Sequence, residues 1–181
     1  MLNAVTGVVD EKIVVVSHRE HVDKYRKAID GSASILVDKG NIHGPLAGVF
    51  TGFEKAQGEY SLLLPCDTPF VSRDILSLLL ELGPGRNACV PRWPSGYVEP
   101  LQAVYCTKSA LEASSVALGA GKLNVQAMLD RLQCVRYVST LVLQQLDPEL
   151  RTFFNVNTPL DLKKAEQMFD CTRSRTYGPS K

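Results

Sequence analysis

The 181-residue chain has few of the features that mark secreted, zinc-stabilised or membrane proteins. Its five cysteines are scattered, odd in number and free of C-x-x-C pairs, which argues against a disulfide framework or a structural zinc site. No apolar run reaches the roughly 18 residues that a membrane span needs, and no signal-peptide pattern opens the chain. A net charge of +1 indicates no basic surface for nucleic acid or membranes. We therefore expect a cytoplasmic protein that binds neither.

The pattern of apolar residues predicts one α/β domain. A hydrophobic fraction of 45% is enough for a sizeable core. Short apolar runs typical of strands alternate with segments whose apolar residues recur at helical spacing. This alternation predicts a mostly parallel sheet covered by helices. We expect the domain to span residues 1–169 and the polar, basic residues 170–181 to form a mobile tail.

The run from Ser61 to Leu64 is the clearest buried strand, and Asp67 follows it between Pro65 and Pro69. Ligands of open α/β sheets lie at the carboxyl ends of the strands, so Asp67 stands where chemistry is expected. A single hard carboxylate there suits Mg²⁺, which takes one or two carboxylates together with substrate phosphates. The alternative is a turn in which Asp67 only caps the following backbone.

Two glycines interrupt the helix predicted after Gly44, where Pro45 suits the first helical position. Gly48 and Gly52 each cost roughly 1 kcal/mol relative to alanine inside a helix. Either another backbone or a ligand comes close to these glycines, or the helix packs tightly against its neighbours.

Local patterns also predict the elements at the two ends of the chain. Residues 1–9 have helical spacing, and residues 153–157 read as a strand. Thr158, followed by proline and then by an acid, is typical of a helix start, and we expect that helix to end near Phe169.

Two further side chains have more than one interpretation. Glu99 either contacts a cofactor or metal or makes a structural hydrogen bond, and the structural role is favoured. Cys66, beside Asp67, is expected to be a small buried side chain rather than a nucleophile, because no histidine adjoins it in the sequence.

Three motifs in a fixed order resemble the molybdenum cofactor guanylyltransferase family. They are GPLAG at 44–48, LPCDTPF at 64–70 and FNVNTPLDL at 154–162, and VEPLQAVY at 98–105 is also similar. The resemblance implies a Rossmann-like, three-layer nucleotidyltransferase fold. It also implies transfer of GMP from GTP to the molybdopterin cofactor, with Mg²⁺ and release of pyrophosphate. A molybdoenzyme apoprotein or its chaperone is a further partner that the resemblance leaves open.

The same resemblance implies a role for each matching position. Asp67 corresponds to the family's catalytic, metal-binding aspartate, which also contacts the nucleotide. Asp38 and Ser17 correspond to nucleotide-contacting positions, although Ser17 stands where members often have asparagine. Asn155 and Asn157 correspond to the paired asparagines near the active site, where they would bind the pterin cofactor. Alternatively, Asp38 is a loop cap and Asn157 only precedes a helix cap.

The chain departs from the family at its N-terminus. Members begin with a strand and a glycine-rich loop of the type L-A-G-G-x-S-x-R-M-G, with a lysine just beyond, and this loop cradles the triphosphate. We expect the first strand to be missing from the sheet, and we favour a sequence that is short at its start. One alternative is a degenerate, non-catalytic protein that binds the pterin cofactor or a partner. Another is a sibling enzyme, a molybdopterin cytidylyltransferase or a phospholactate guanylyltransferase.

Overall fold

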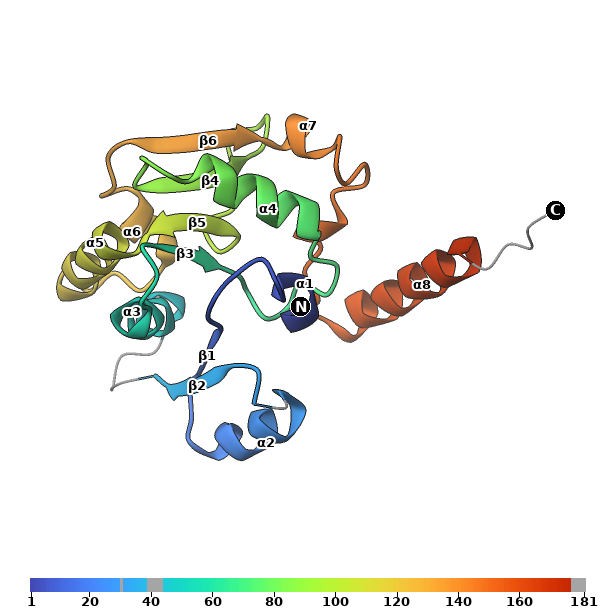
Figure 1. Ribbon diagram of the computed structural model, residues 1–181, viewed down its shortest axis with the longest axis horizontal. Helices are drawn as coiled ribbons and strands as arrows, with labels where there is room; N and C mark the ends of the chain where they lie inside the picture. The colour runs from blue at the N-terminus through green and yellow to red at the C-terminus, as the bar shows by residue number, and fades with distance from the viewer. Residues whose placement is uncertain (30, 39–43, 177–181) are drawn as a thin grey trace.

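The computed structural model describes residues 1–29, 31–38 and 44–176, with side chains up to Asp170. Helices and strands alternate along most of this length, as predicted (Figure 1). In chain order the elements are α1 (Leu2–Val5), β1 (Ile13–Val16), α2 (Glu20–Ile29), β2 (Ser34–Val37), α3 (Pro45–Lys55), β3 (Tyr60–Leu63), α4 (Arg73–Leu82), β4 (Ala88–Arg92), β5 (Ala103–Cys106), α5 (Thr107–Gly119), α6 (Val125–Leu129), β6 (Val135–Ser139), α7 (Thr140–Leu143), the 3₁₀ helix η1 (Arg151–Phe153) and α8 (Pro159–Thr176).

The strands form two sheets. Four strands pair in the order β3-β5-β4-β6, and β1 pairs with β2 in a separate parallel pair. Strand β5 runs antiparallel to both β3 and β4, whereas β4 and β6 are parallel. The α/β class is therefore confirmed, with a mixed sheet in which β3, β4 and β6 share one direction. In the described part of the chain, β1 has a neighbouring strand only on its β2 side, and β3 has one only on its β5 side. The family resemblance implies a further strand between these two sheets.

Helices cover both faces of the four-stranded sheet, which gives the predicted three layers (Figure 1). Along β5, Ala103 and Tyr105 face α3, α5 and α6, and Val104 between them faces α4. This alternation follows from the two-residue period of a strand, which sends neighbouring side chains to opposite faces. Both faces are thus apolar, and the core is split into two clusters by the sheet.

Helix α3 connects the two sheets. Its Phe53 ring packs edge-on against Tyr105 of the larger sheet, with centroids 5.9 Å apart. On its other side, Gly48 and Gly52 face Val15 of β1. A Cβ atom added at these glycines would lie 3.8 Å and 3.6 Å from the Val15 methyl groups, which is ordinary contact. A side-chain methyl group would therefore fit at both positions, and the contacts require neither of the two explanations for these glycines.

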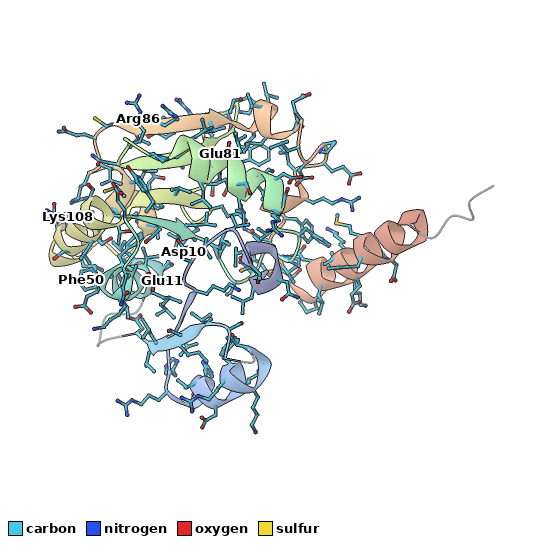
Figure 2. The ribbon with its side chains drawn as sticks, in the orientation of Figure 1. Asp10, Glu11, Phe50, Glu81, Arg86 and Lys108 are labelled. Atoms are coloured by element: carbon cyan, nitrogen blue, oxygen red, sulfur yellow. The ribbon has the colours of Figure 1, made fainter. Side chains whose placement is uncertain are left out.

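The amino ends of β1 and β3 lie together despite belonging to different sheets. The carboxylate of Glu11, labelled in Figure 2, accepts hydrogen bonds from the backbone N–H groups of Gln57 at 2.6 Å and Gly58 at 3.3 Å. The two donors lie three and two residues before β3, and Glu11 lies two residues before β1. The two sheets therefore begin on the same side of the molecule.

Three predicted elements differ from the observed ones. Helix α1 ends at Val5 rather than extending over residues 1–9, because Thr6 is extended and Gly7 turns the chain with a φ of +77°. Residues 154–157 form no strand, since the N–H of Val156 bonds to a loop carbonyl rather than to a neighbouring strand. Helix α8 continues past Phe169 to Thr176, because no glycine or proline interrupts that stretch.

No helix of the described residues is long and apolar enough to cross a membrane.

Candidate functional site

Asp67 lies in the loop that follows β3, at the carboxyl end of that strand. Within this loop the hydroxyl of the buried Thr68 donates to the carbonyl of Pro65 at 3.3 Å. The backbone carbonyl of Asp67 accepts the N–H of Val156 at 2.9 Å. Its carboxylate atom Oδ1 is buried and is without a hydrogen-bond partner among the described residues. A buried carboxylate oxygen that is left unpaired is costly, so this atom is suited to a ligand that the protein itself does not supply.

The donor set around Asp67 fits a magnesium ion better than a zinc ion. No group of three or more histidine, cysteine, aspartate or glutamate side chains that could hold a metal is found in the described ranges. Zinc is held by three or four such ligands, whereas Mg²⁺ uses one or two carboxylates and keeps water and phosphate oxygens as its other ligands. The single unpaired oxygen of Asp67 is the kind of hard donor that Mg²⁺ takes.

Asn155 lies beside the Asp67 loop, although not on a strand as expected. The segment after η1 is anchored on two sides by neighbouring aromatic residues. The Phe153 ring packs against Trp93 with centroids 5.7 Å apart, and the Phe154 ring packs against Phe70 at 6.1 Å. The next residue is Asn155, and its side chain is exposed. Its amide is therefore free to meet a ligand next to Asp67.

Asn157 is also exposed, and it immediately precedes the cap of α8. The hydroxyl of Thr158 accepts the N–H of Asp161 at 3.2 Å, and the Asp161 carboxylate accepts the N–H of Thr158 at 3.0 Å. This reciprocal pair is the capping arrangement that the sequence predicts. Hydrogen bonds from Thr158 lower the pKa of the Asp161 carboxyl group. The structure assigns the cap to Thr158, and Asn157 is left outside it.

Thr152 is a residue of this region that the sequence did not reveal. It is almost fully buried, and its hydroxyl accepts the N–H of Ser72 at 2.9 Å and donates to the carbonyl of Phe70 at 3.4 Å. Its carbonyl accepts a hydrogen bond from the buried Gln102 amide at 2.8 Å. Thr152 thus joins the loop after β3, the segment before β5 and the segment before α8. The partners are far apart in the sequence, so no local pattern points to this role.

Ser17 and Asp38 lie next to one another at the carboxyl ends of β1 and β2. The N–H of Asp38 donates to the carbonyl of Val16 at 2.8 Å, which continues the pairing of the two strands. The Asp38 carboxylate accepts the hydroxyl of Thr51 from α3 at 3.1 Å. The Ser17 hydroxyl lies 2.9 Å from the Nδ1 atom of His18. These contacts bring Ser17 and Asp38 to each other and tie Asp38 to α3, and none of them reaches Asp67.

Two other predicted side chains can be placed. Cys66 is exposed, so the expectation of a buried residue was wrong; the buried side chain of this loop is that of Thr68. Glu99 is partly buried, and its carboxylate accepts the indole N–H of Trp93 at 2.7 Å. Burial raises the pKa of the Glu99 carboxyl group, and the hydrogen bond from Trp93 lowers it by less.

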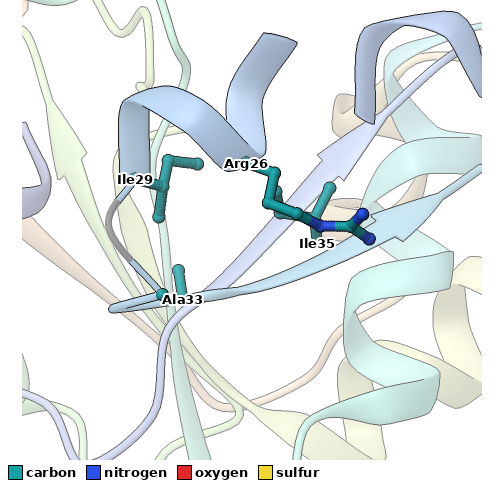
Figure 3. Close-up of a pocket in the computed structure, with 5 residues that line it drawn as sticks. Arg26, Ile29, Ala33 and Ile35 are labelled. Carbon is teal, nitrogen blue, oxygen red and sulfur yellow. The ribbon is translucent and has the colours of Figure 1, made fainter. Parts of the chain in front are cut away.

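Two hollows in the described surface lie away from these residues. One of about 250 Å³ lies between α2 and β2, with an apolar floor of Ile29, Ala33 and Ile35 and the Arg26 guanidinium at one side (Figure 3). A second, more open one of about 420 Å³ includes Asn87 at the amino end of β4. Neither contains a predicted site residue.

Comparison with known proteins identifies the family. Residues 1–135 match the model of the MobA-like NTP transferase domain. The chain belongs to this nucleotidyltransferase family. A relative from Methanosarcina mazei, named probable molybdenum cofactor guanylyltransferase, is 35% identical over 90% of this chain and 74% of its own length. One from Syntrophotalea carbinolica, named molybdenum cofactor guanylyltransferase, is 31% identical over 85% of this chain and 70% of its own.

Solved structures agree on the fold of this MobA-like chain. The crystal structure of molybdopterin-guanine dinucleotide biosynthesis protein A from Archaeoglobus fulgidus superposes with a TM-score of 0.73 at 29% identity, over 89% of this chain and 78% of that one. A 4-diphosphocytidyl-2C-methyl-D-erythritol synthase from Anaerococcus prevotii superposes with a TM-score of 0.71 at 15% identity, over 93% and 83% of the two chains, and so supports the fold alone. The predicted family, the Rossmann-like fold and the enzyme class of nucleotidyltransferase are confirmed.

Proposed function

We propose that this chain transfers GMP from GTP to the molybdopterin cofactor and releases pyrophosphate, using Mg²⁺. The names of relatives at 31–35% identity support this substrate pair. The structural observation that supports it is the buried, unpaired Oδ1 atom of Asp67 at the carboxyl end of β3. The backbone carbonyl of Asp67 accepts the N–H of Val156, the residue after Asn155, so a possible metal donor and a polar amide lie on neighbouring segments at one edge of the sheet.

The proposed reaction is a displacement at the α-phosphorus of GTP. A phosphate oxygen of the acceptor forms a bond to that phosphorus, the bond between the α- and β-phosphates breaks, and pyrophosphate leaves with the electron pair. Bound at Asp67, Mg²⁺ would supply positive charge that offsets the charge of the phosphates. Asp67 is thus the proposed catalytic and metal-binding residue.

The remaining site residues bind and orient the two substrates in this proposal. Asn155 and Asn157 would hydrogen-bond the pterin, because an amide both donates and accepts. Ser17 and Asp38 would contact the nucleotide from the ends of β1 and β2. Holding both reactants in line is itself a large part of catalysis in phosphoryl transfer.

The test compares the wild-type chain with Asp67→Asn in three measurements: calorimetry with GTP and Mg²⁺, turnover with molybdopterin cofactor, and urea unfolding. We expect Asp67→Asn to abolish turnover. Its midpoint of unfolding should be equal to or higher than that of the wild type, because Oδ1 has no hydrogen bond to lose and the buried charge is removed. Asp10→Asn, which neutralises an exposed carboxylate (Figure 2), is the matched control and should leave all three measurements unchanged.

Other outcomes point to the alternatives. Turnover with CTP in preference to GTP would favour a sibling cytidylyltransferase. A folded wild-type chain that retains the pterin cofactor but binds no GTP would replace the enzyme with a binding protein. Turnover by Asp67→Asn at a rate within a few-fold of the wild type would remove Asp67 from the mechanism.

A further inference from the structure

The loop between β4 and β5 rises from the same edge of the sheet as Asp67. Strands β3 and β4 both run antiparallel to β5, so their carboxyl ends lie at one edge. Beyond β4 the chain forms a tight hairpin: the N–H of Trp93 donates to the carbonyl of Tyr97 at 2.8 Å, and Gly96 turns the chain with a φ of +90°. The hairpin closes through a bridge between Arg92 and Val98. Glu99 follows this bridge directly.

The Glu99 carboxylate has little of its hydrogen-bonding capacity used. It accepts one hydrogen bond, from the Trp93 indole at 2.7 Å, whereas an ionised carboxylate can accept about four. No lysine, arginine or histidine of the described residues forms an ion pair with it. The side chain is nevertheless partly buried. Tyr97, the neighbouring aromatic residue, is 62% exposed, and the charge of Glu99 raises its pKa.

Glu99 is held next to the Asp67 loop by register and by packing. Leu63 of β3 pairs with Ala103 of β5. Asp67 follows Leu63 by four residues and Glu99 precedes Ala103 by four residues, so both lie beyond the edge formed by the carboxyl end of β3. The Trp93 ring packs on Phe153, which is two residues before Asn155 in the segment that bonds to Asp67. The two carboxylates therefore lie beyond the same edge of the sheet, on extensions of two paired strands.

A carboxylate with free acceptor capacity near the exposed ring of Tyr97 suits one kind of ligand. The aromatic faces favour a flat heterocycle. The carboxylate favours two adjacent N–H donors, which it accepts bidentately. A 2-amino-4-oxopyrimidine has such a pair, its ring N–H and its 2-amino group, and guanine and pterins share this edge. Neutral cytosine and adenine have a ring acceptor in place of the ring donor.

We infer that Glu99 is a specificity-determining residue that accepts the ring N–H and 2-amino group of a 2-amino-4-oxopyrimidine at the Asp67 site. This inference rests on the proposed function for the identity of the two heterocycles, guanine and pterin. It assigns to the protein a means of selecting a base that does not depend on the phosphate contacts.

Glu99→Gln is the substitution that tests this inference most directly. The glutamine oxygen can still accept the Trp93 indole N–H, so the hairpin keeps its tether. The second oxygen becomes an NH₂ group, which would face the donors of the ligand instead of accepting from them. Glu81→Gln changes an exposed glutamate of α4 in the same way and serves as the matched control (Figure 2).

The experiment measures the binding of two ligand pairs to the wild-type chain and to both variants. Calorimetry with Mg²⁺ compares GTP with ITP, which lacks the 2-amino group. Pterin fluorescence compares pterin with lumazine, which carries an oxygen in place of that group. We expect the wild type to prefer the amino member of at least one pair by about tenfold to a hundredfold, and Glu99→Gln to remove that preference. Glu81→Gln should retain it.

The pair that shows the preference identifies the ligand as nucleotide or pterin. The inference is overturned if the wild type shows no preference in either pair, or if Glu99→Gln retains the preference at an unchanged midpoint of urea unfolding. Failure of the proposed function is read separately, from the absence of GTP turnover by the wild-type chain.

Discussion

Thr152→Val tests whether the buried threonine holds the site loops together. Valine has nearly the same shape, so the substitution removes the hydroxyl and leaves the packing. The N–H of Ser72 then loses its 2.9 Å acceptor in a partly buried position, and the weak 3.4 Å bond to Phe70 adds little. A buried donor left without a partner costs about 1–3 kcal/mol. With a urea m-value of about 2 kcal/mol per molar, the midpoint of unfolding should fall by about 0.5–1.5 M.

Two controls separate this effect from general destabilisation. Thr152→Ser keeps the hydroxyl and removes one buried methyl group, so it should cost only about 1 kcal/mol. Thr107→Val removes another buried hydroxyl, which donates to the carbonyl of Gly58 at 2.7 Å at the opposite edge of the sheet. It should destabilise the protein as much as Thr152→Val does.

The variants should differ in activity. Thr152→Val displaces the loops that flank Asp67, so kcat/KM should fall about tenfold or more, whereas Thr107→Val should retain both kcat and KM. An unchanged unfolding midpoint for Thr152→Val, or an equal loss of activity in Thr107→Val, would refute the reasoning.

Three further predictions follow from packing and burial. Gly44→Ala should lower the free energy of unfolding, because its Cβ would lie 2.9 Å from the Cβ of Leu123. Gly52→Ala should raise the free energy of unfolding by about 1 kcal/mol, because its Cβ fits. Urea unfolding measures both, and a gain in stability for Gly44→Ala would contradict the packing. The pKa of Glu99 is raised from its ordinary 4.5, so the folded state binds more protons than the unfolded state just above pH 4.5. The free energy of unfolding should therefore fall as the pH rises through the window above 4.5. This contribution to the pH dependence should be absent in Glu99→Gln, and an equal pH dependence in wild type and variant would disprove the prediction. Burial raises the pKa of Cys89 to about 11, so iodoacetamide at pH 8 should leave Cys89 unmodified in the folded chain, and mass spectrometry that finds it alkylated there would overturn its burial.

The alternation of helices and strands was predictable because it depends on local periodicity. The strand before Asp67, the helix that begins at Pro45 and the capped helix that begins at Pro159 all carry their signals within a few residues. Where the local signal was ambiguous, tertiary contacts decided. Residues 154–157 alternate like a strand, but the N–H of Val156 bonds to the carbonyl of Asp67 in a loop, and no ladder forms among the described residues.

The candidate site was predictable in part. Asp67 could be chosen as a candidate because ligands of α/β folds bind at the carboxyl ends of the strands, and Asp67 follows a buried strand. The positions of Asn155 and of Ser17 and Asp38 relative to Asp67 could not, since the first is brought near by packing on Phe70 and Trp93 and the other two are carried on a separate pair of strands.

The sequence by itself determined the class of fold, the family and the carboxylate at the end of β3, because each depends on residue types at short spacings along the chain. Only the tertiary structure decided that Oδ1 of Asp67 is buried without a partner, that Thr152 joins three loops, and that Glu99 borders the same edge. Hydrogen bonds and burial of this kind join residues that are many positions apart, and chain order alone does not specify which of them meet.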